Sequence, residues 1–176
     1  MTPGLHEIDQ NKHDAYVLSV EADKMLAEGY INEARLKMSE AANLDKAYAV
    51  RAELIGHEDK RKIRVSSTVR RIIIPFLIEA DFKIKDNVHW SEGKDLQRKI
   101  NDVNNVVLIG RDKFGNRLSI LAAKWKDPKE VEYYDWHSIG MRSGSLAYKT
   151  QEELELVCRR WCEIINIHIL PWFDKT

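Results

Sequence analysis

The first part of the chain carries two series of small and apolar residues at helical spacing. The first series is Ala15, Leu18, Ala22, Met25 and Leu26, and the second is Ala34, Met38 and Ala41. This spacing places each series on one face of a helix. Gly29 stands between them and permits a sharp reversal of the chain. The pattern predicts a helical hairpin whose apolar faces pack on the rest of the chain or on another subunit.

A strongly apolar segment follows a basic stretch that begins at Lys60. Ser66, Ser67 and Thr68 are each suited to cap a helix. The predicted helix then carries its apolar residues at Ile72, Ile73, Phe76, Leu77 and Ala80. Because proline lacks a backbone N–H, Pro75 should kink this helix or mark a late start.

The centre of the chain has the composition of β-strands. Short runs at 82–86 (FKIKD) and 88–90 (VHW) precede two β-rich runs within 105–125, joined across Asp112–Asn116. Gly115 and Asn116 suit the left-handed conformations of a hairpin turn. Residues 131–148 are rich in aromatic residues and glycine, which indicates one further strand and a loop.

The strongest helix signal lies at the C-terminal end. Thr150 and Glu153 match a capping box, and Pro171 is expected to stop the helix. One face is formed by Leu154, Val157, Cys158, Trp161, Ile164, Ile165 and His168. This face should cover a sheet that carries Val107, Ile109, Leu118 and Ile120, with Trp172 and Phe173 folded back across its end.

These elements predict an α+β fold, in which an N-terminal helical hairpin packs on an antiparallel sheet flanked by helices and a long C-terminal helix. With 176 residues and 44% apolar content, the chain can bury one core and a small appended unit. Residues 1–59 hold 12 acidic and 6 basic side chains, whereas residues 60–176 hold 16 and 22. We therefore divide the chain into a helical segment, 1–59, and an α+β domain, 60–176.

The small residues of the predicted hairpin resemble those of a tetratricopeptide repeat. That family places small residues at intervals of seven, five and seven, which this chain matches with Ala22, Gly29, Ala34 and Ala41. Leu44-Asp45 is similar to the end of the repeat, although Lys46 stands where the family has proline. The resemblance covers residues 12–57 and implies contact with a protein. Residues 66–174 resemble small bacterial domains grouped only as families of unknown function.

Composition limits the environment in which the chain works. No apolar run approaches the roughly 20 residues that span a bilayer, and no secretion signal is evident at the N-terminus. Cys158 and Cys162 are four residues apart on one predicted helix, which aligns them poorly for a disulfide. We expect reduced thiols, a cytoplasmic location and no membrane contact.

The basic stretch is the first candidate for a binding site. It comprises Lys60, Arg61, Lys62, Arg64, Arg70 and Arg71, whose side chains are suited to phosphate contacts with a nucleic acid. The 28 basic and 28 acidic side chains of the whole chain argue against a dedicated polyanion binder. A solvated helix face and docking against the acidic N-terminal segment are the alternative interpretations.

The second candidate is an aromatic cluster at Tyr133, Tyr134, Trp136 and His137. Tyrosine and tryptophan are frequent at protein interfaces, and Asp135 is placed to orient the imidazole. Successive residues of a strand point to opposite faces, so about half of the cluster should belong to the core. The cluster is a candidate partner-binding surface.

Signatures of catalysis are missing from the sequence. It has no glycine-rich phosphate loop, no nucleophile elbow and no paired metal-ligand motif, and Lys124 lacks the nearby acid of a metal-dependent nuclease site. Cys158, Cys162 and His168 supply too few ligands for zinc, and the cysteines fit a core. We predict a protein-interaction module without catalytic residues, metal or cofactor, whose partner is another protein or a second copy. A nucleic-acid-associated protein and an enzyme without a local motif are the alternatives.

Overall fold

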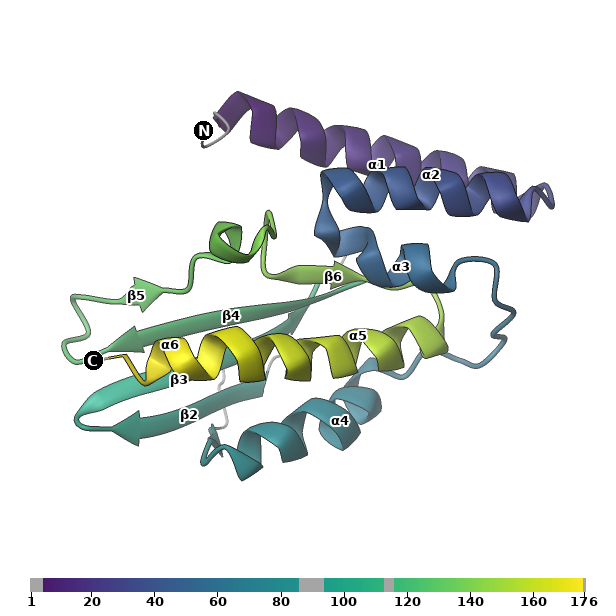
Figure 1. The fold of residues 1–176 in the computed structure, drawn as a ribbon. Helices are drawn as coiled ribbons and strands as arrows, with labels where there is room; N and C mark the ends of the chain where they lie inside the picture. The colour runs from purple at the N-terminus through teal and green to yellow at the C-terminus, as the bar shows by residue number, and fades with distance from the viewer. Residues whose placement is uncertain (1–4, 86–93, 113–115, 176) are drawn as a thin grey trace.

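The computed structural model describes residues 5–85, 94–112 and 116–175, which form the predicted α+β fold. The N-terminal hairpin consists of α1 (Leu5–Ala27) and α2 (Ile31–Leu44), followed by the short helices η1 (Lys46–Tyr48) and α3 (Ala49–Leu54). Figure 1 shows the hairpin stacked on α3, which lies between it and the rest of the molecule. None of the helices in the described ranges combines the length and apolarity required to cross a bilayer.

The sheet is antiparallel throughout its described part and has the order β1-β2-β3-β4-β5. Its strands are β1 (Lys83–Lys85), β2 (Lys94–Ile100), β3 (Val103–Arg111), β4 (Arg117–Trp125) and β5 (Glu132–Tyr133), and β6 (Ser145–Ala147) also pairs with β4. The register places Leu96, Val107 and Ala122 side by side. These three residues face the helices and are buried.

Strand β2 was not predicted, because only Leu96 within it is fully buried and its other residues are mostly polar. Asn101 and Asp102, both at positive φ, form the tight turn between β2 and β3. Asparagine and aspartate tolerate this conformation, which a two-residue hairpin turn requires. The predicted run 88–90 and most of the predicted turn before Asn116 lie outside the described residues.

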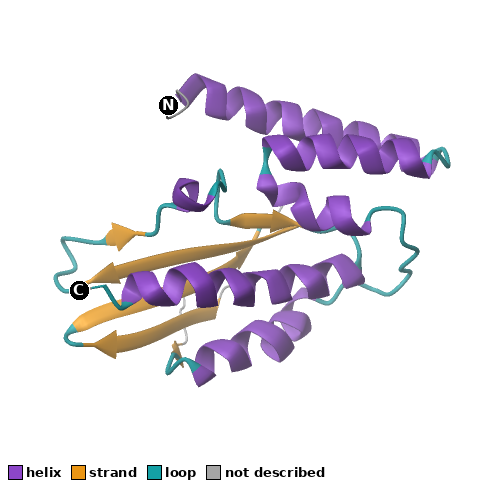
Figure 2. Cartoon of the chain, viewed as in Figure 1, coloured by secondary structure: helices purple, strands orange, loops and turns teal. Residues whose placement is uncertain are grey.

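A layer of helices covers one face of the sheet (Figures 1 and 2). It contains α4 (Val65–Glu79), α5 (Gln151–Ile164), the π-helical turn η3 (Ile165–Ile169) and α6 (Leu170–Phe173), while η2 (Trp136–Ile139) precedes β6. The predicted core is confirmed, since Leu154, Val157 and Trp161 pack with Val107, Ile109, Leu118 and Ile120. Trp161 is completely buried, and its indole N–H donates to the Leu118 carbonyl at 3.2 Å.

Two details of the helices differ from the prediction, at Pro171 and at the start of α4. Pro171 does not end the C-terminal helix. The π-helical turn η3 comes before it, so Pro171 lies in the first turn of α6, where no backbone N–H is needed. Pro75 lies inside α4 with its ring exposed to solvent. Helix α4 begins at Val65 without a side-chain cap, and Ser67 and Thr68 instead donate to the Arg64 carbonyl.

The hairpin has a small core of its own that is continuous with the sheet. Ala22, Met38 and Ala41 are completely buried there, and Met25 and Leu26 are partly buried against the same cluster. Tyr48 and Ile55 from the following segment and Ala147 from β6 complete this core. Conversely, Val50 of α3 belongs to the main core between sheet and helices. The predicted docking of the hairpin on the α+β domain is therefore seen within one chain.

Charged side chains reinforce this attachment. The Arg51 guanidinium donates two hydrogen bonds to Asp23 of α1, at 2.8 and 3.1 Å, and lies 3.4 Å from the Glu153 carboxylate of α5. Lys149 lies 3.1 Å from the same Asp23. Burial opposes ionisation of Asp23, but the two cations outweigh it and lower its pKa. Burial raises the pKa of Glu153 despite the nearby Arg51.

A row of polar side chains closes the core beneath α6. Arg98, Asn105 and Lys124 are neighbours in register on β2, β3 and β4. Lys124 donates to the carbonyls of Trp172 and Lys175, and Arg98 donates to the Asp174 carboxylate at 2.8 Å. Cations at these positions suit the negative end of a helix. The Asn105 amide between them is completely buried and has no hydrogen-bond partner among the described residues.

We expect Trp161→Ala to lower the free energy of unfolding by about 3 to 5 kcal/mol, because it leaves a large cavity and an unpaired Leu118 carbonyl. Denaturant unfolding measures the change. The matched control is Arg159→Ala on the exposed side of the same helix, which should stay within about 0.5 kcal/mol of the wild type. A loss below about 1 kcal/mol for Trp161→Ala would contradict the burial of this face.

Asn105→Leu should raise the free energy of unfolding by about 1 kcal/mol, because an unpaired buried amide is costly and leucine has a similar volume. Asn104→Leu is the control, since the Asn104 amide donates to the Trp125 carbonyl at 3.5 Å and is only half-buried. Thermal and denaturant unfolding of both variants check the prediction. Destabilisation by Asn105→Leu would show that this amide has a partner that the protein needs.

Candidate functional site

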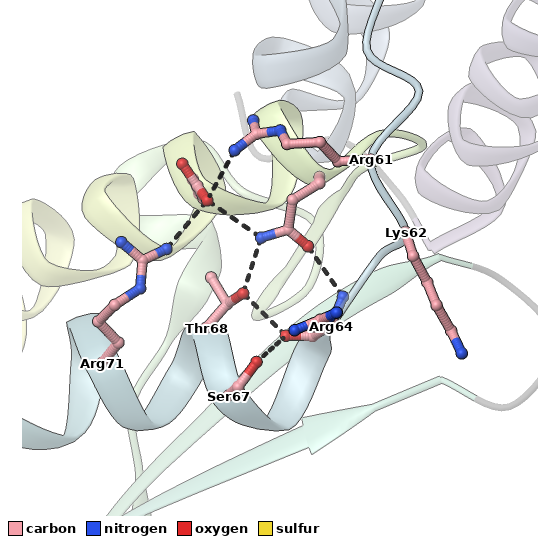
Figure 3. A pocket seen from close by; sticks show the side chains of 8 residues that line it. Arg61, Lys62, Arg64, Ser67, Thr68 and Arg71 are labelled. Carbon is pink, nitrogen blue, oxygen red and sulfur yellow. Dashed lines mark hydrogen bonds and ion pairs between the residues drawn. The ribbon is translucent and has the colours of Figure 1, made fainter.

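A polar basin lies where the linker before α4 meets the first turns of α4 and α5. Its volume is about 410 Å³. Figure 3 shows that its side chains come from three separate segments of the chain. The lining consists of Arg61, Lys62, Arg64, Ser67, Thr68, Arg71, Gln151 and Glu155. The structure thus gathers four of the six predicted basic residues around one concave surface.

The Glu155 carboxylate is the centre of this basin. One of its oxygens accepts from Gln151 at 3.1 Å, from Arg61 at 3.4 Å and from Arg71 at 2.9 Å. The Gln151 hydrogen bond and the two cations lower the pKa of Glu155. The two arginines are therefore brought together by a carboxylate that remains ionised.

Gln151 holds the wall of the basin in place. Its amide N–H group donates to the Thr68 hydroxyl at 2.9 Å, and its carbonyl oxygen accepts from the Arg64 backbone at 2.8 Å. Gln151 and Thr68 are both buried. These bonds supply the N-terminal cap that α4 lacks in its own sequence.

Asp59 fixes the linker at the rim. Its carboxylate accepts from the Arg61 side chain and backbone, both at 3.0 Å, and from the Glu152 backbone at 2.6 Å. The Arg61 contacts lower the pKa of Asp59 to about 2. A carboxylate at the start of α5 also complements the positive end of that helix. Arg61 is consequently held close to the basin although most of its side chain is exposed.

The remaining predicted basic residues have different surroundings. Lys62 and Arg64 line the basin, on the side away from Arg71 in Figure 3. Lys60 and Arg70 are exposed and do not line it. Across the described ranges, no carboxylate lies within ion-pair distance of Lys60, Lys62, Arg64 or Arg70. Within the described residues, the ion pairs of the basic stretch join Arg61 and Arg71 to Glu155 of α5 and Arg61 to Asp59 at the end of the acidic segment, and none of them reaches α1 or α2.

The predicted aromatic cluster is divided by the fold. Tyr134 and Trp136 are half-buried and pack against the main core, with Trp136 at 5.4 Å from the Trp161 ring and Tyr134 at 5.4 Å from Trp172. Tyr133 is 62% exposed on β5. His137 is also exposed, and its imidazole lies 3.4 Å from Asp135. Only Tyr133 and His137 are available at the surface.

The hairpin presents a further surface, which was not predicted. Of the twelve large hydrophobic residues exposed in the described part of the chain, six lie between residues 16 and 36. They are Tyr16, Val17, Val20, Tyr30, Ile31 and Leu36. Tyr16 and Val20 are four residues apart and so share one side of α1. Helix α1 is apolar on two sides, of which one packs on α2 and the other faces solvent.

The thiols and acids offer little chemistry. Burial raises the pKa of Cys158 to about 12 and that of Cys162 to about 11, so both are protonated thiols near neutral pH. Within the described ranges, no three histidine, cysteine, aspartate or glutamate side chains converge to hold a metal ion. The basin and the exposed apolar residues of the hairpin are therefore the two candidate binding surfaces among the described residues.

Comparisons with protein-family models, curated proteins and solved structures give no significant match to this chain. The tetratricopeptide-like spacing of the hairpin therefore stays a prediction, as does the resemblance of the second part to small bacterial families.

Asp59, Gln151 and Glu155 were not recognised as part of a site. Gln151 and Glu155 are four residues apart and share a side of the predicted C-terminal helix, which was the available signal. Their partners lie more than 80 positions away in the sequence. Only tertiary structure shows that this side meets the basic stretch.

The stabilising effect of Glu155 should depend on pH. Because its pKa is lowered on folding, its contribution is present above its ordinary pKa of 4.5 and is lost as pH falls through the lower folded value. The difference in unfolding free energy between the wild type and Glu155→Gln should therefore narrow from about pH 7 to about pH 3. Glu163→Gln on the exposed side of α5 is the control. A difference that widens on acidification would contradict the assignment.

Proposed function

We propose that this chain is a non-catalytic protein-interaction module and that the exposed side of its hairpin is the docking surface. The observation that carries the proposal is the concentration of exposed apolar residues between 16 and 36. Among them, Tyr16, Val17 and Val20 lie within about one turn of α1, and exposed apolar side chains grouped in this way mark sites of protein contact. The tetratricopeptide-like spacing supports the same proposal, because helical hairpins of that kind present their faces to other proteins.

The surface suits a partner with an apolar ridge. Tyr16 and Val20 are 57% and 49% exposed, and Val17 lies beside them. Tyrosine supplies a large contact area for little loss of conformational entropy, which favours it as an anchor. The hairpin is held on the domain by buried contacts and by Asp23, so partner binding to the outer side leaves that attachment intact.

A role in nucleic-acid binding is less well supported. Arg61 and Arg71 are both occupied by Glu155, which leaves Lys60, Lys62, Arg64 and Arg70 for phosphate contacts. Four cations at a balanced net charge make a weak, salt-sensitive footprint. Tyr133 and His137 remain a smaller alternative surface for a protein partner.

Affinity capture from a lysate of the native cell tests the proposal. Tyr16→Ser combined with Val20→Ser should reduce recovery of the partner by at least about tenfold, because such anchors contribute more than about 1 kcal/mol each. Ile78→Ser removes a similarly exposed apolar residue from α4 and should leave recovery unchanged. Light scattering over a range of concentrations distinguishes a second copy from a different partner.

Undiminished capture by the Tyr16→Ser and Val20→Ser variant would reject the hairpin as the docking surface. Tyr133→Ser then shows whether the aromatic edge of the sheet carries the contact. Circular dichroism confirms that the variants are folded, which is expected because all of the substituted side chains are exposed.

A further inference from the structure

The basin between α4 and α5 has more positive charge than its neighbours neutralise. Arg61, Lys62, Arg64 and Arg71 line it, and Glu155 is the one carboxylate of the lining. Four like charges around one concavity repel each other unless an anion lies among them. Glu155 and Asp59, which pairs with Arg61 at the rim, together compensate for about two of the four.

The position of Glu155 shows where an oxyanion is stabilised. Its oxygen accepts from Gln151, Arg61 and Arg71, which belong to α5, the linker and α4 respectively. Donors from three segments therefore converge on one point without any change of backbone. Gln151 and Asp59 keep this arrangement in place through the backbones of Arg64, Arg61 and Glu152.

Lys62 and Arg64 extend the positive charge beyond the carboxylate. Both side chains are exposed and line the basin, and no carboxylate in the described part of the chain lies within ion-pair distance of either. Because they make no ion pair there, a ligand can engage them without breaking an existing one. They form the accessible part of the basin.

We propose that this basin binds a phosphate monoester through Lys62 and Arg64, with Arg61 and Arg71 completing the site. A monoester carries a charge of about −1.5 to −2 at neutral pH and three terminal oxygens. This charge fits the excess of about two that Glu155 and Asp59 leave uncompensated. Arginine forks bind such oxygens in a bidentate manner.

The converging geometry distinguishes this ligand from nucleic acid. A nucleic-acid strand offers one charge per phosphate and is held by cations spread along its backbone. In the basin, Arg61 and Arg71 instead converge on a single oxygen of Glu155, and Arg70 and Lys60 lie outside the lining. The monoester can belong to a small molecule or to a phosphorylated side chain of a protein. The site is separate from the apolar side of the hairpin and does not depend on it.

Calorimetric titration of the full chain with inorganic phosphate and O-phosphoserine, at constant ionic strength, tests the proposal. Lys62→Ala combined with Arg64→Ala should weaken binding at least tenfold. Arg70→Ala is the matched control, since Arg70 is exposed on α4 outside the basin. This variant should bind as the wild type does. Glu155→Gln should tighten binding several-fold, because it releases Arg71 and removes a competing charge, while Asp59 still holds Arg61.

A phosphoserine peptide and its unphosphorylated form distinguish the two sources. Tighter binding of the phosphopeptide than of free phosphoserine assigns the site to a modified protein, and equal binding assigns it to a small phosphate ester. The proposal is overturned if the wild type shows no saturable binding or if Lys62→Ala with Arg64→Ala has no effect. It is also overturned if single-stranded RNA binds more tightly than O-phosphoserine and Arg70→Ala weakens RNA binding as much as Lys62→Ala with Arg64→Ala does. The hairpin variant Tyr16→Ser with Val20→Ser should bind phosphate normally.

Discussion

The Glu153 carboxylate at the start of α5 accepts the backbone N–H groups of Lys149 and Thr150 and faces the Arg51 guanidinium, which in turn holds Asp23 of α1. One helix turn thus ends a loop, begins the helix over the core and secures the hairpin. Glu153 and Arg51 are both buried, and loss of Arg51 leaves the Glu153 carboxylate without its cation, at a cost of about 3 to 5 kcal/mol. Gln151 and Glu155 of the same turn organise the basin.

This arrangement connects the hairpin and the basin to the same turn of α5. The first turn of α5 directs Glu153 toward the hairpin and Gln151 and Glu155 toward α4. Side chains two residues apart on a helix point in different directions, so a single turn can serve both neighbours. The apolar side of the hairpin and the cationic basin share this support and little else.

Local signals were sufficient to predict much of the fold. The capping box at Thr150, the apolar series around Ala22 and Ala34, and the paired runs within 105–125 each depend on residues close in sequence. Strand β2 was missed because Leu96 is its one fully buried apolar residue, so its sequence shows little alternation. Pro171 was misjudged because a π turn placed it at the start of a new helix, an event that depends on packing beneath α6.

The candidate site was less accessible to prediction. The basic residues were recognised from composition, but the carboxylates that organise them lie far away in sequence. The aromatic cluster had the right composition for an interface, and the fold uses Tyr134 and Trp136 in ring contacts with Trp172 and Trp161 instead. The hairpin surface was not predicted, because the buried series of α1 accounts for its helical spacing without the exposed residues Tyr16, Val17 and Val20.

The sharing of Ala147 and Glu153 between the hairpin and the domain has a consequence for biosynthesis. Translation proceeds from the N-terminus, so the hairpin leaves the ribosome long before the residues on which it is seated. Until Ala147 and Glu153 emerge, the hairpin core lacks its contact with β6, and Arg51 lacks one of its two carboxylate partners. Because most of the hairpin core comes from residues 15–55, the early chain leaves exposed mainly the part that β6 covers, and the acidic excess of residues 1–59 disfavours its association with other copies.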